Sequence, residues 1–170
     1  MNKPIRHTKK STRARATADS PVMLGGMPRA LGVRLISVSR KKIVGELPIT
    51  SMHLNKGGNV NGGAMMAFGD VLGACGAVAN RPPGHRGGTI ESKTNFFAQG
   101  RGPALSGVSI PLHIGRTTSV WQTTIKNPDG RTVAIVTQTQ IEIPIEPKET
   151  ANVTSKRAHA RKGVKRGGAA

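Results

Sequence analysis

The stretch that decides the fold is Asn55-Lys-Gly-Gly-Asn-Val-Asn-Gly-Gly-Ala-Met-Met-Ala-Phe-Gly-Asp-Val-Leu-Gly-Ala-Cys-Gly-Ala-Val-Ala79. A loop rich in Gly and Asn leads into small and apolar residues, which predicts a helix over about 62–79 that is buried all round. Asp70 is the only charged residue between Lys56 and Arg81. Burial of an unpaired carboxylate is costly and raises its pKa. Asp70 is therefore the first candidate for chemistry.

Both ends of this helix are marked in the sequence. Asn61 is a good N-cap, because its side-chain oxygen can accept from the first free N–H groups. The segment Asn80-Arg-Pro-Pro-Gly84 ends the helix. Each Gly inside the helix costs about 1 kcal/mol relative to Ala. The many glycines therefore predict close approach of a neighbouring backbone, as when a sheet wraps round the helix.

The rest of the chain reads as strands with a polar tail at each end. The apolar patterns predict strands over 30–39, 43–49, 89–98, 104–114, 119–126 and 131–143, with a hairpin turn at 127–130. One helix among antiparallel strands is an α+β architecture. A single curled sheet leaves open edges, which a second copy of the chain can cover. We expect basic, disordered tails at 1–22 and 147–170 and one domain over 23–146.

Composition and charge distribution limit the kinds of nucleic-acid binding that the chain can support. Only 2% of the residues are aromatic, which argues against single-stranded nucleic-acid modules with aromatic platforms. Of the net charge of +18, most lies in residues 1–20 and 151–170, which hold twelve Lys/Arg and one acid. The domain itself is only mildly basic. The tails allow weak, nonspecific binding to nucleic acid or an anionic surface.

Other kinds of site lack their motifs. There is no Gly-x-Ser-x-Gly elbow, no P-loop and no zinc-spaced His/Cys cluster. We therefore expect neither a metal nor a cofactor. Cys75 is the only cysteine and cannot form an intrachain disulfide. It reads as a small buried apolar residue, and the default compartment is the cytoplasm.

Geometry limits how Asp70 can work with the helix N-terminus. The free N–H groups at Gly62 suit a developing oxyanion. Gly62 and Asp70 are eight residues apart, about 12 Å along a helix. One carbonyl group cannot touch both. Either Gly62 and Asp70 have separate functions, or Gly62 of one chain faces Asp70 of another in an isologous dimer with two sites.

The loop and helix resemble those of the hotdog-fold acyl-CoA thioesterases. The shared pattern is Asn55-x-x-Gly-x-Val-x-Gly-Gly63 followed by Asp70, with further likeness at 88–97, 115–119 and 127–130. The nearest branch is that of the phenylacetic-acid-degradation and 4-hydroxybenzoyl-CoA thioesterases. The resemblance covers about 31–143. It implies an antiparallel sheet of five to six strands round one central helix, in a homodimer that is often a dimer of dimers.

The resemblance also implies roles for single residues. Asp70 would be general base or nucleophile, Gly62 of the partner chain the oxyanion donor, and Asn55 a positioning group. Asn61 stands where the family commonly has His, and it cannot carry a proton. Further substrate contacts would come from Gly63, Met66, Lys93 and the turn residues Arg116, Thr117 and Thr118.

The expected reaction is hydrolysis of an acyl-CoA thioester to the free acid and CoA. The alternative is a domain that binds acyl-CoA without turnover, tethered through its tails to nucleic acid or an anionic membrane. A hydratase of the same fold ranks third, because the expected Asp/His pairing is missing.

Overall fold

The computed structural model describes residues 24–146, so the tails predicted at 1–22 and 147–170 lie outside the described residues. Within this range a short helix precedes two strands, a 3-10 turn, the long helix and four more strands. The elements are α1 (Gly26–Ala30), β1 (Arg34–Val38), β2 (Ile43–Pro48), η1 (Ser51–His53), α2 (Gly62–Asn80), β3 (His85–Phe96), β4 (Ala104–Ile114), β5 (Thr118–Lys126) and β6 (Thr132–Pro144).

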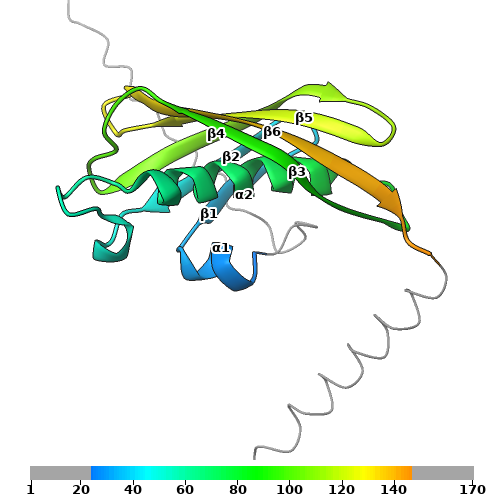
Figure 1. The fold of residues 1–170 in the computed structure, drawn as a ribbon, viewed down its shortest axis with the longest axis horizontal. Helices are drawn as coiled ribbons and strands as arrows, with labels where there is room; N and C mark the ends of the chain where they lie inside the picture. The colour runs from blue at the N-terminus through cyan, green and yellow to red at the C-terminus, as the bar shows by residue number, and fades with distance from the viewer. Residues whose placement is uncertain (1–23, 147–170) are drawn as a thin grey trace, which may run out of the picture.

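The six strands form one antiparallel sheet in the order β1-β2-β4-β5-β6-β3. The sheet curves over α2, and α1 lies on the side of α2 away from the sheet (Figure 1). The α+β prediction is confirmed. Strands β1 and β3 are the two edges, and β3 pairs with β6 on one side only within the described residues.

The glycines of α2 let the helix lie directly on the sheet. A Cβ added at Gly69 would come within 2.3 Å of the Val136 side chain, and one added at Gly76 within 2.5 Å of the Trp121 ring. These contacts are closer than real Cβ atoms allow. The close approach expected from the glycine content is therefore confirmed.

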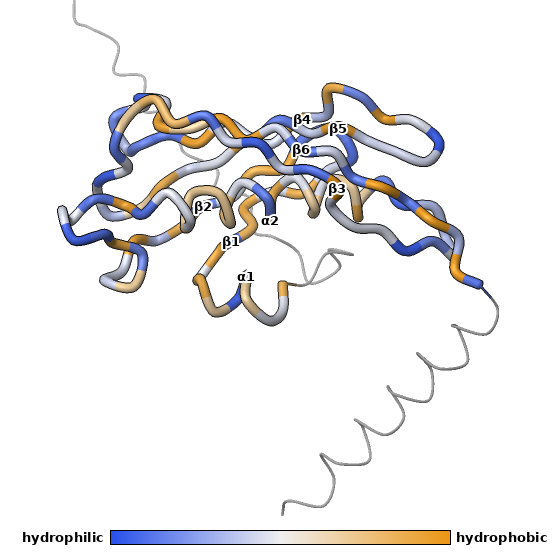
Figure 2. The backbone as a smooth tube through the Cα atoms, viewed as in Figure 1, coloured by the Kyte–Doolittle hydropathy of each residue, from blue (hydrophilic) through white to orange (hydrophobic). Residues whose placement is uncertain are grey.

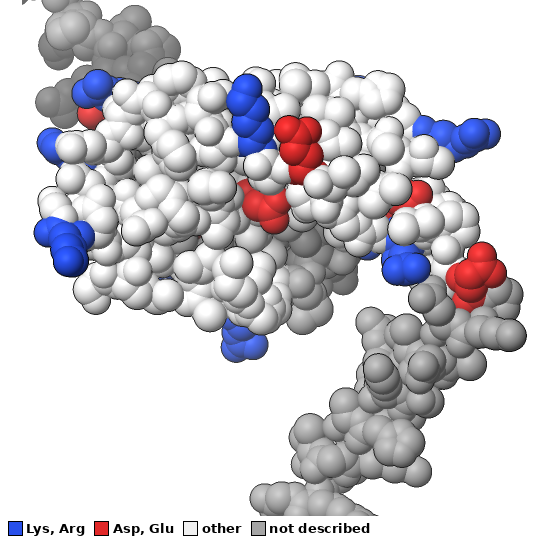
Figure 3. Space-filling view, in the orientation of Figure 1, with Lys and Arg blue, Asp and Glu red and all other residues white. Residues whose placement is uncertain are grey.

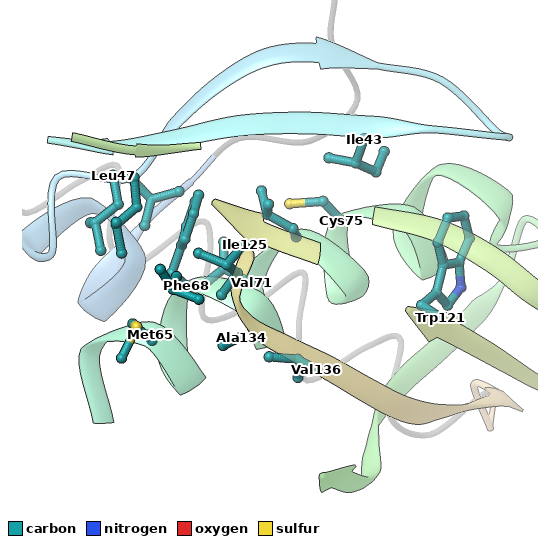
Figure 4. Packing of buried hydrophobic residues seen from close by; sticks show 14 of the residues in the cluster. Ile43, Leu47, Met65, Phe68, Val71, Cys75, Trp121, Ile125, Ala134 and Val136 are labelled. Carbon is teal, nitrogen blue, oxygen red and sulfur yellow. The ribbon is translucent and has the colours of Figure 1, made fainter. Parts of the chain in front are cut away.

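The core between α2 and the sheet is mostly aliphatic, with one Phe and one Trp. Phe68 lies near Leu47 and Ile125, and Trp121 packs towards the end of the helix (Figure 4). Hydrophobic and hydrophilic residues alternate along much of the sheet (Figure 2). By length and composition α2 could cross a membrane, but its packing identifies it as the core helix.

Three expectations need correction. The helix is not buried all round, since Met66 is 41% exposed and, within residues 24–146, α1 is the element that lies over that side. Residues 26–30 form α1, where the positive φ of Gly26 and the C-cap at Leu31 set its ends, so the first strand begins at Arg34 rather than 30. The third strand begins at His85, because its pairing with β6 extends to Pro144.

Strand β6 turns its more polar face inward. Ala134, Val136, Gln138, Gln140 and Glu142 are buried, whereas the alternating Ile and Thr residues between them are only half-buried or exposed. The pairing register explains which face of β6 is buried. The inward-facing residues of β6 lie opposite inward-facing residues of β5 and β3. Polar side chains thus lie beneath the middle and C-terminal half of α2.

Gly76→Ala should destabilise the domain by about 1–3 kcal/mol, because the added methyl overpacks a rigid indole ring. The gain in helix propensity offsets only about 1 kcal/mol of the clash. Thermal or urea unfolding measures the change. Gly88→Ala is the control, since its Cβ would meet nothing within 4 Å. Equal stability of the two variants would contradict this packing.

Candidate functional site

Asp70 lies in the middle of α2, half-buried, on the side that faces strand β3. Thr89 Oγ1 of β3 donates to Asp70 Oδ1 over 3.4 Å. Burial raises the pKa of Asp70 above 3.8, and the hydrogen bond from Thr89 opposes that rise. Removal from water and a nearby donor are the conditions that tune a carboxylate for base or nucleophile chemistry.

Two buried glutamines of β6 support Asp70 from below. Gln140 Nε2 donates to Thr89 Oγ1 over 2.8 Å, and Gln138 Nε2 donates to the backbone carbonyl of Asp70 over 3.2 Å. Gln138 is 1% and Gln140 2% exposed. Sequence reasoning missed Thr89 and both glutamines. The signal available was the Gln-x-Gln alternation in a strand predicted to pack against the helix.

Asp70 opens onto a groove between α1 and α2. The groove has a volume of about 320 Å³, and Leu24 and Pro28 line one wall while Val71, Ala74 and Val78 line the other. Cys75 also lines it, and burial raises the pKa of the Cys75 thiol to about 11. Its thiol therefore stays protonated at neutral pH, in keeping with the apolar role predicted for it.

A second groove of about 350 Å³ lies on the other side of α1. It is lined by Met27, Met52 and His53 together with Asn61 and Ala67 of the helix and its cap. Asp70 lines the first groove and not this one. Of these two grooves beside α1 and α2, the first reaches the carboxylate.

The N-terminus of α2 is capped as predicted, and the cap leaves one donor free. Asn61 Oδ1 accepts from the N–H of Gly63 over 2.8 Å. Among residues 24–146, no protein acceptor faces the N–H of Gly62. The ring of Phe96 lies against Gly62, with its nearest atom 3.2 Å from where a Cβ would stand. Gly62, rather than Gly63, therefore has a backbone N–H to offer a ligand.

Asn55 lies in the loop before the helix and shapes that loop. Its Oδ1 accepts from the N–H groups of Gly57, over 2.9 Å, and Asn59, over 3.2 Å. This hydrogen bonding closes a tight turn of the kind that Asn favours. The oxygen is thus engaged, and the side-chain amide N–H₂ of Asn55 is the group left to meet a substrate.

The remaining predicted substrate contacts are spread over the domain. Arg116 and Thr117 lie in the exposed turn between β4 and β5, which Thr118 follows, and the Thr117 carbonyl accepts from Glu142 N over 2.8 Å. Glu142 also pairs with Arg81 just after α2, over 2.6 Å. This turn is therefore at the C-terminal end of α2, opposite Gly62.

Lys93 and Met66 lie apart from these turn residues. Lys93 is exposed and in register with Thr137, on the sheet face away from Gln138 and Asp70. Met66 is on the exposed side of α2. On the face shown in Figure 3, basic and acidic side chains lie close together near the middle, over β3 and α2.

Within one chain, these residues form three separate groups. Gly62, Asn61 and Asn55 lie at the start of α2, Asp70 lies at its middle, and Arg116 lies near its end. The helix has 19 residues, so its ends are about 27 Å apart at 1.5 Å per residue. The residues predicted for one reaction do not meet in one protomer.

Comparison with known proteins agrees with the fold and the loop-helix motif. The model of the thioesterase superfamily matches residues 57–134. A 1,4-dihydroxy-2-naphthoyl-CoA hydrolase of Listeria monocytogenes is 23% identical over 110 residues, which are 65% of this chain and 89% of the relative.

Two solved structures share the fold. A hypothetical thioesterase of Streptococcus pneumoniae, whose structure contains coenzyme A, superposes with a TM-score of 0.60 and 25% identity, over 66% of this chain and 86% of that one. A thioesterase of Haemophilus influenzae superposes with a TM-score of 0.65 and 19% identity, over 71% and 85% of the two chains. The chain thus resembles the thioesterase superfamily over residues 57–134, and its antiparallel sheet round one long helix is the hotdog fold of its thioesterase neighbours.

Proposed function

We propose that this protein hydrolyses acyl-CoA thioesters to the free acid and CoA, with Asp70 as its catalytic carboxylate. The observation that carries the proposal is the position of Asp70: half-buried at mid-helix, held by Thr89 and open to an apolar groove. The matches to a CoA hydrolase and to a thioesterase solved with coenzyme A support the substrate class. The single, unpaired cysteine is compatible with a reaction in the cytoplasm.

The chemistry needs one base and one oxyanion donor. As general base, Asp70 takes a proton from a water molecule that attacks the thioester carbonyl carbon. As nucleophile, it attacks that carbon directly, and water then hydrolyses the anhydride. In either course the carbonyl oxygen becomes negative, the C–S bond breaks, and CoA leaves as the thiol after taking up a proton. Thr89 engages Oδ1, so Oδ2 is the oxygen left to react.

The oxyanion donor is the N–H of Gly62 in a second copy of the chain. Strand β3 is a sheet edge of 12 residues on which Ile90 is 59% and Phe96 47% exposed. Such an edge invites pairing with another strand. Antiparallel pairing of two β3 edges about a two-fold axis lays the two α2 helices side by side in opposite directions. A tetramer built from two such dimers stays a prediction.

The contacts between α2 and β3 fix the register of this dimer. Phe96 lies against Gly62, and Thr89 lies against Asp70, in the same chain. A two-fold axis that brings one chain's Gly62 to the other's Asp70 must also bring Phe96 opposite Thr89. The proposed β3 pairing is therefore centred at residues 92–93, and the exposed Met66, midway between Gly62 and Asp70, lies near the axis.

This arrangement also places the CoA-contacting turn. The C-terminal half of α2 in one protomer runs beside the N-terminal loop of its partner. Arg116 and Asp70 of one chain would then serve the same site as Gly62 and Asn55 of the other. A cation near the mouth of the site suits the phosphates of CoA.

Asp70→Asn should lower thiol release by at least about 10²-fold, because the amide keeps the shape of the carboxylate but is neither base nor nucleophile. The assay follows free CoA from a panel of short, long and aromatic acyl-CoAs. Asp129→Asn is the control, since Asp129 lies in the β5–β6 turn, where its Oδ1 accepts from the N–H of Arg131. Unchanged thiol release from every substrate in Asp70→Asn would refute the proposed function.

Gly62→Pro should lower kcat by about 10²- to 10³-fold, which is the usual cost of removing one oxyanion donor. Proline is well tolerated at the first position of a helix, and Asn61 has the extended ψ of 139° that a residue before proline needs. Gly62→Ala is the matched control, because it adds a Cβ beside Phe96 but keeps the N–H. Equal activity of the two variants would exclude Gly62 as the donor.

Ala74→Leu should reduce the preference for octanoyl-CoA over acetyl-CoA by about tenfold or more, because the new side chain fills the groove that reaches Asp70. Ala67→Leu is the matched control, since it stands on the same helix but lines the other groove. The measurement is kcat/KM for both substrates. A larger loss of preference in Ala67→Leu would place the acyl group in the second groove instead.

A further inference from the structure

Three side chains from three elements form a continuous chain of hydrogen bonds at the site. Gln140 Nε2 of β6 donates to Thr89 Oγ1 of β3 over 2.8 Å, and Thr89 Oγ1 donates to Asp70 Oδ1 of α2 over 3.4 Å. Gln140 is 2% exposed, so water does not compete for its amide. A buried amide needs a partner, and here that partner is the hydroxyl that contacts the carboxylate.

The direction of these bonds follows from the number of protons available. The Thr89 hydroxyl has one proton and two lone pairs. Because it accepts from the Gln140 amide, its one proton remains for Asp70. The opposite amide orientation would present the Gln140 oxygen to Thr89 and take that proton. A Thr89 lone pair would then face an ionised carboxylate, which is unfavourable.

We propose that Gln140 is a positioning residue for Asp70. It acts through Thr89, by orienting the threonine hydroxyl so that it donates its hydrogen bond to the carboxylate. This role rests on the proposed function, in which Asp70 must be ionised and held in one orientation. The bond from Thr89 fixes Oδ1 and aims Oδ2 at the groove. It also favours the charged form of a carboxylate that burial pushes towards the neutral form.

Few other titratable groups face Asp70. The part of α1 and its flank that lines the groove consists of Leu24, Gly25 and Pro28 and contributes no charge. On α2 the neighbour is Cys75, whose raised pKa keeps it neutral. Along β6 the next ionisable group on the inward face is Glu142, which pairs with Arg81. On β3, Glu91 is in register with Thr139 on the outer face.

The pKa of Asp70 can be measured without reference to activity. The chain has only three aspartates, Asp19, Asp70 and Asp129. Protein labelled with ¹³C at the aspartate carboxyl therefore gives three signals, and Asp70→Asn assigns one of them. A pH titration of that signal in each full-length variant reports the ionisation of Asp70 directly.

The test is a double-mutant cycle between Gln140 and Thr89. Gln140→Leu should raise the pKa of Asp70, because nothing then orients the Thr89 hydroxyl to donate its hydrogen bond to the carboxylate. In a Thr89→Val background the same change should have little further effect. Gln140→Glu should raise the pKa more than Gln140→Leu does, because the carboxylate accepts the Thr89 hydroxyl proton in a hydrogen bond and adds a like charge. Thr89→Ser keeps the hydroxyl and should retain the wild-type response to Gln140→Leu.

Gln122→Leu is the matched control. Gln122 Nε2 makes the same kind of contact with a threonine, Thr137 Oγ1, over 3.5 Å, but on the outer face of the sheet. It should leave the Asp70 titration unchanged. If Gln140→Leu does not fold, Gln140→Asn replaces it in the cycle, since it keeps an amide but shortens its reach.

Activity supplies the second readout. A raised pKa lowers the ionised fraction at a given pH, so the acid limb of kcat/KM should move to higher pH by the shift that NMR measures. An unchanged Asp70 titration in Gln140→Leu, or an equal shift in the Thr89→Val background, would overturn the positioning role. Absence of thiol release by the wild-type protein would instead overturn the proposed function, while the NMR cycle would still report on Gln140.

Discussion

The structure depends on the contact between the glycine-bearing face of α2 and the inward face of the sheet. Gly69 lies against Val136, Gly73 against Gln138, and Gly76 against Trp121, each too close for a Cβ. A helix with alanines at these positions would have to stand away from the sheet. The close approach brings Gln138 within hydrogen-bonding distance of the backbone at Asp70. The same contact that builds the core therefore also positions the carboxylate.

The α2 helix and its carboxylate were predictable from sequence because their signals are local. Asn61, the glycines and the lone Asp70 fall in one stretch, and the structure places the helix at Gly62–Asn80, close to the predicted 62–79. The supporting residues were not predictable in this way. Thr89 is 19 residues from Asp70 and 51 from Gln140. Their meeting depends on the pairing of β3 with β6, which no local pattern encodes.

The face of β6 illustrates the limit of a periodic pattern. Alternate residues of the strand form two faces, one with Ile135 and Ile141 and the other with Gln138 and Gln140. Hydrophobicity alone favours burial of the first face. The structure buries the second face, because its residues pair with Trp121 and Thr123 of β5 and so lie beneath α2. A buried polar set costs stability unless its groups are hydrogen-bonded. Beneath Asp70 the amide N–H groups of Gln138 and Gln140 are both hydrogen-bonded.

One protomer contains all the proposed catalytic groups but holds them about 12 Å apart along α2. The central claim is that two chains complete each site, and mixing two inactive variants tests it most directly. Asp70→Asn and Gly62→Pro chains, unfolded and refolded together, form heterodimers with one intact and one doubly altered site. The account predicts recovery of about a quarter of wild-type thiol release at random pairing. A mixture no more active than its separate components would contradict it.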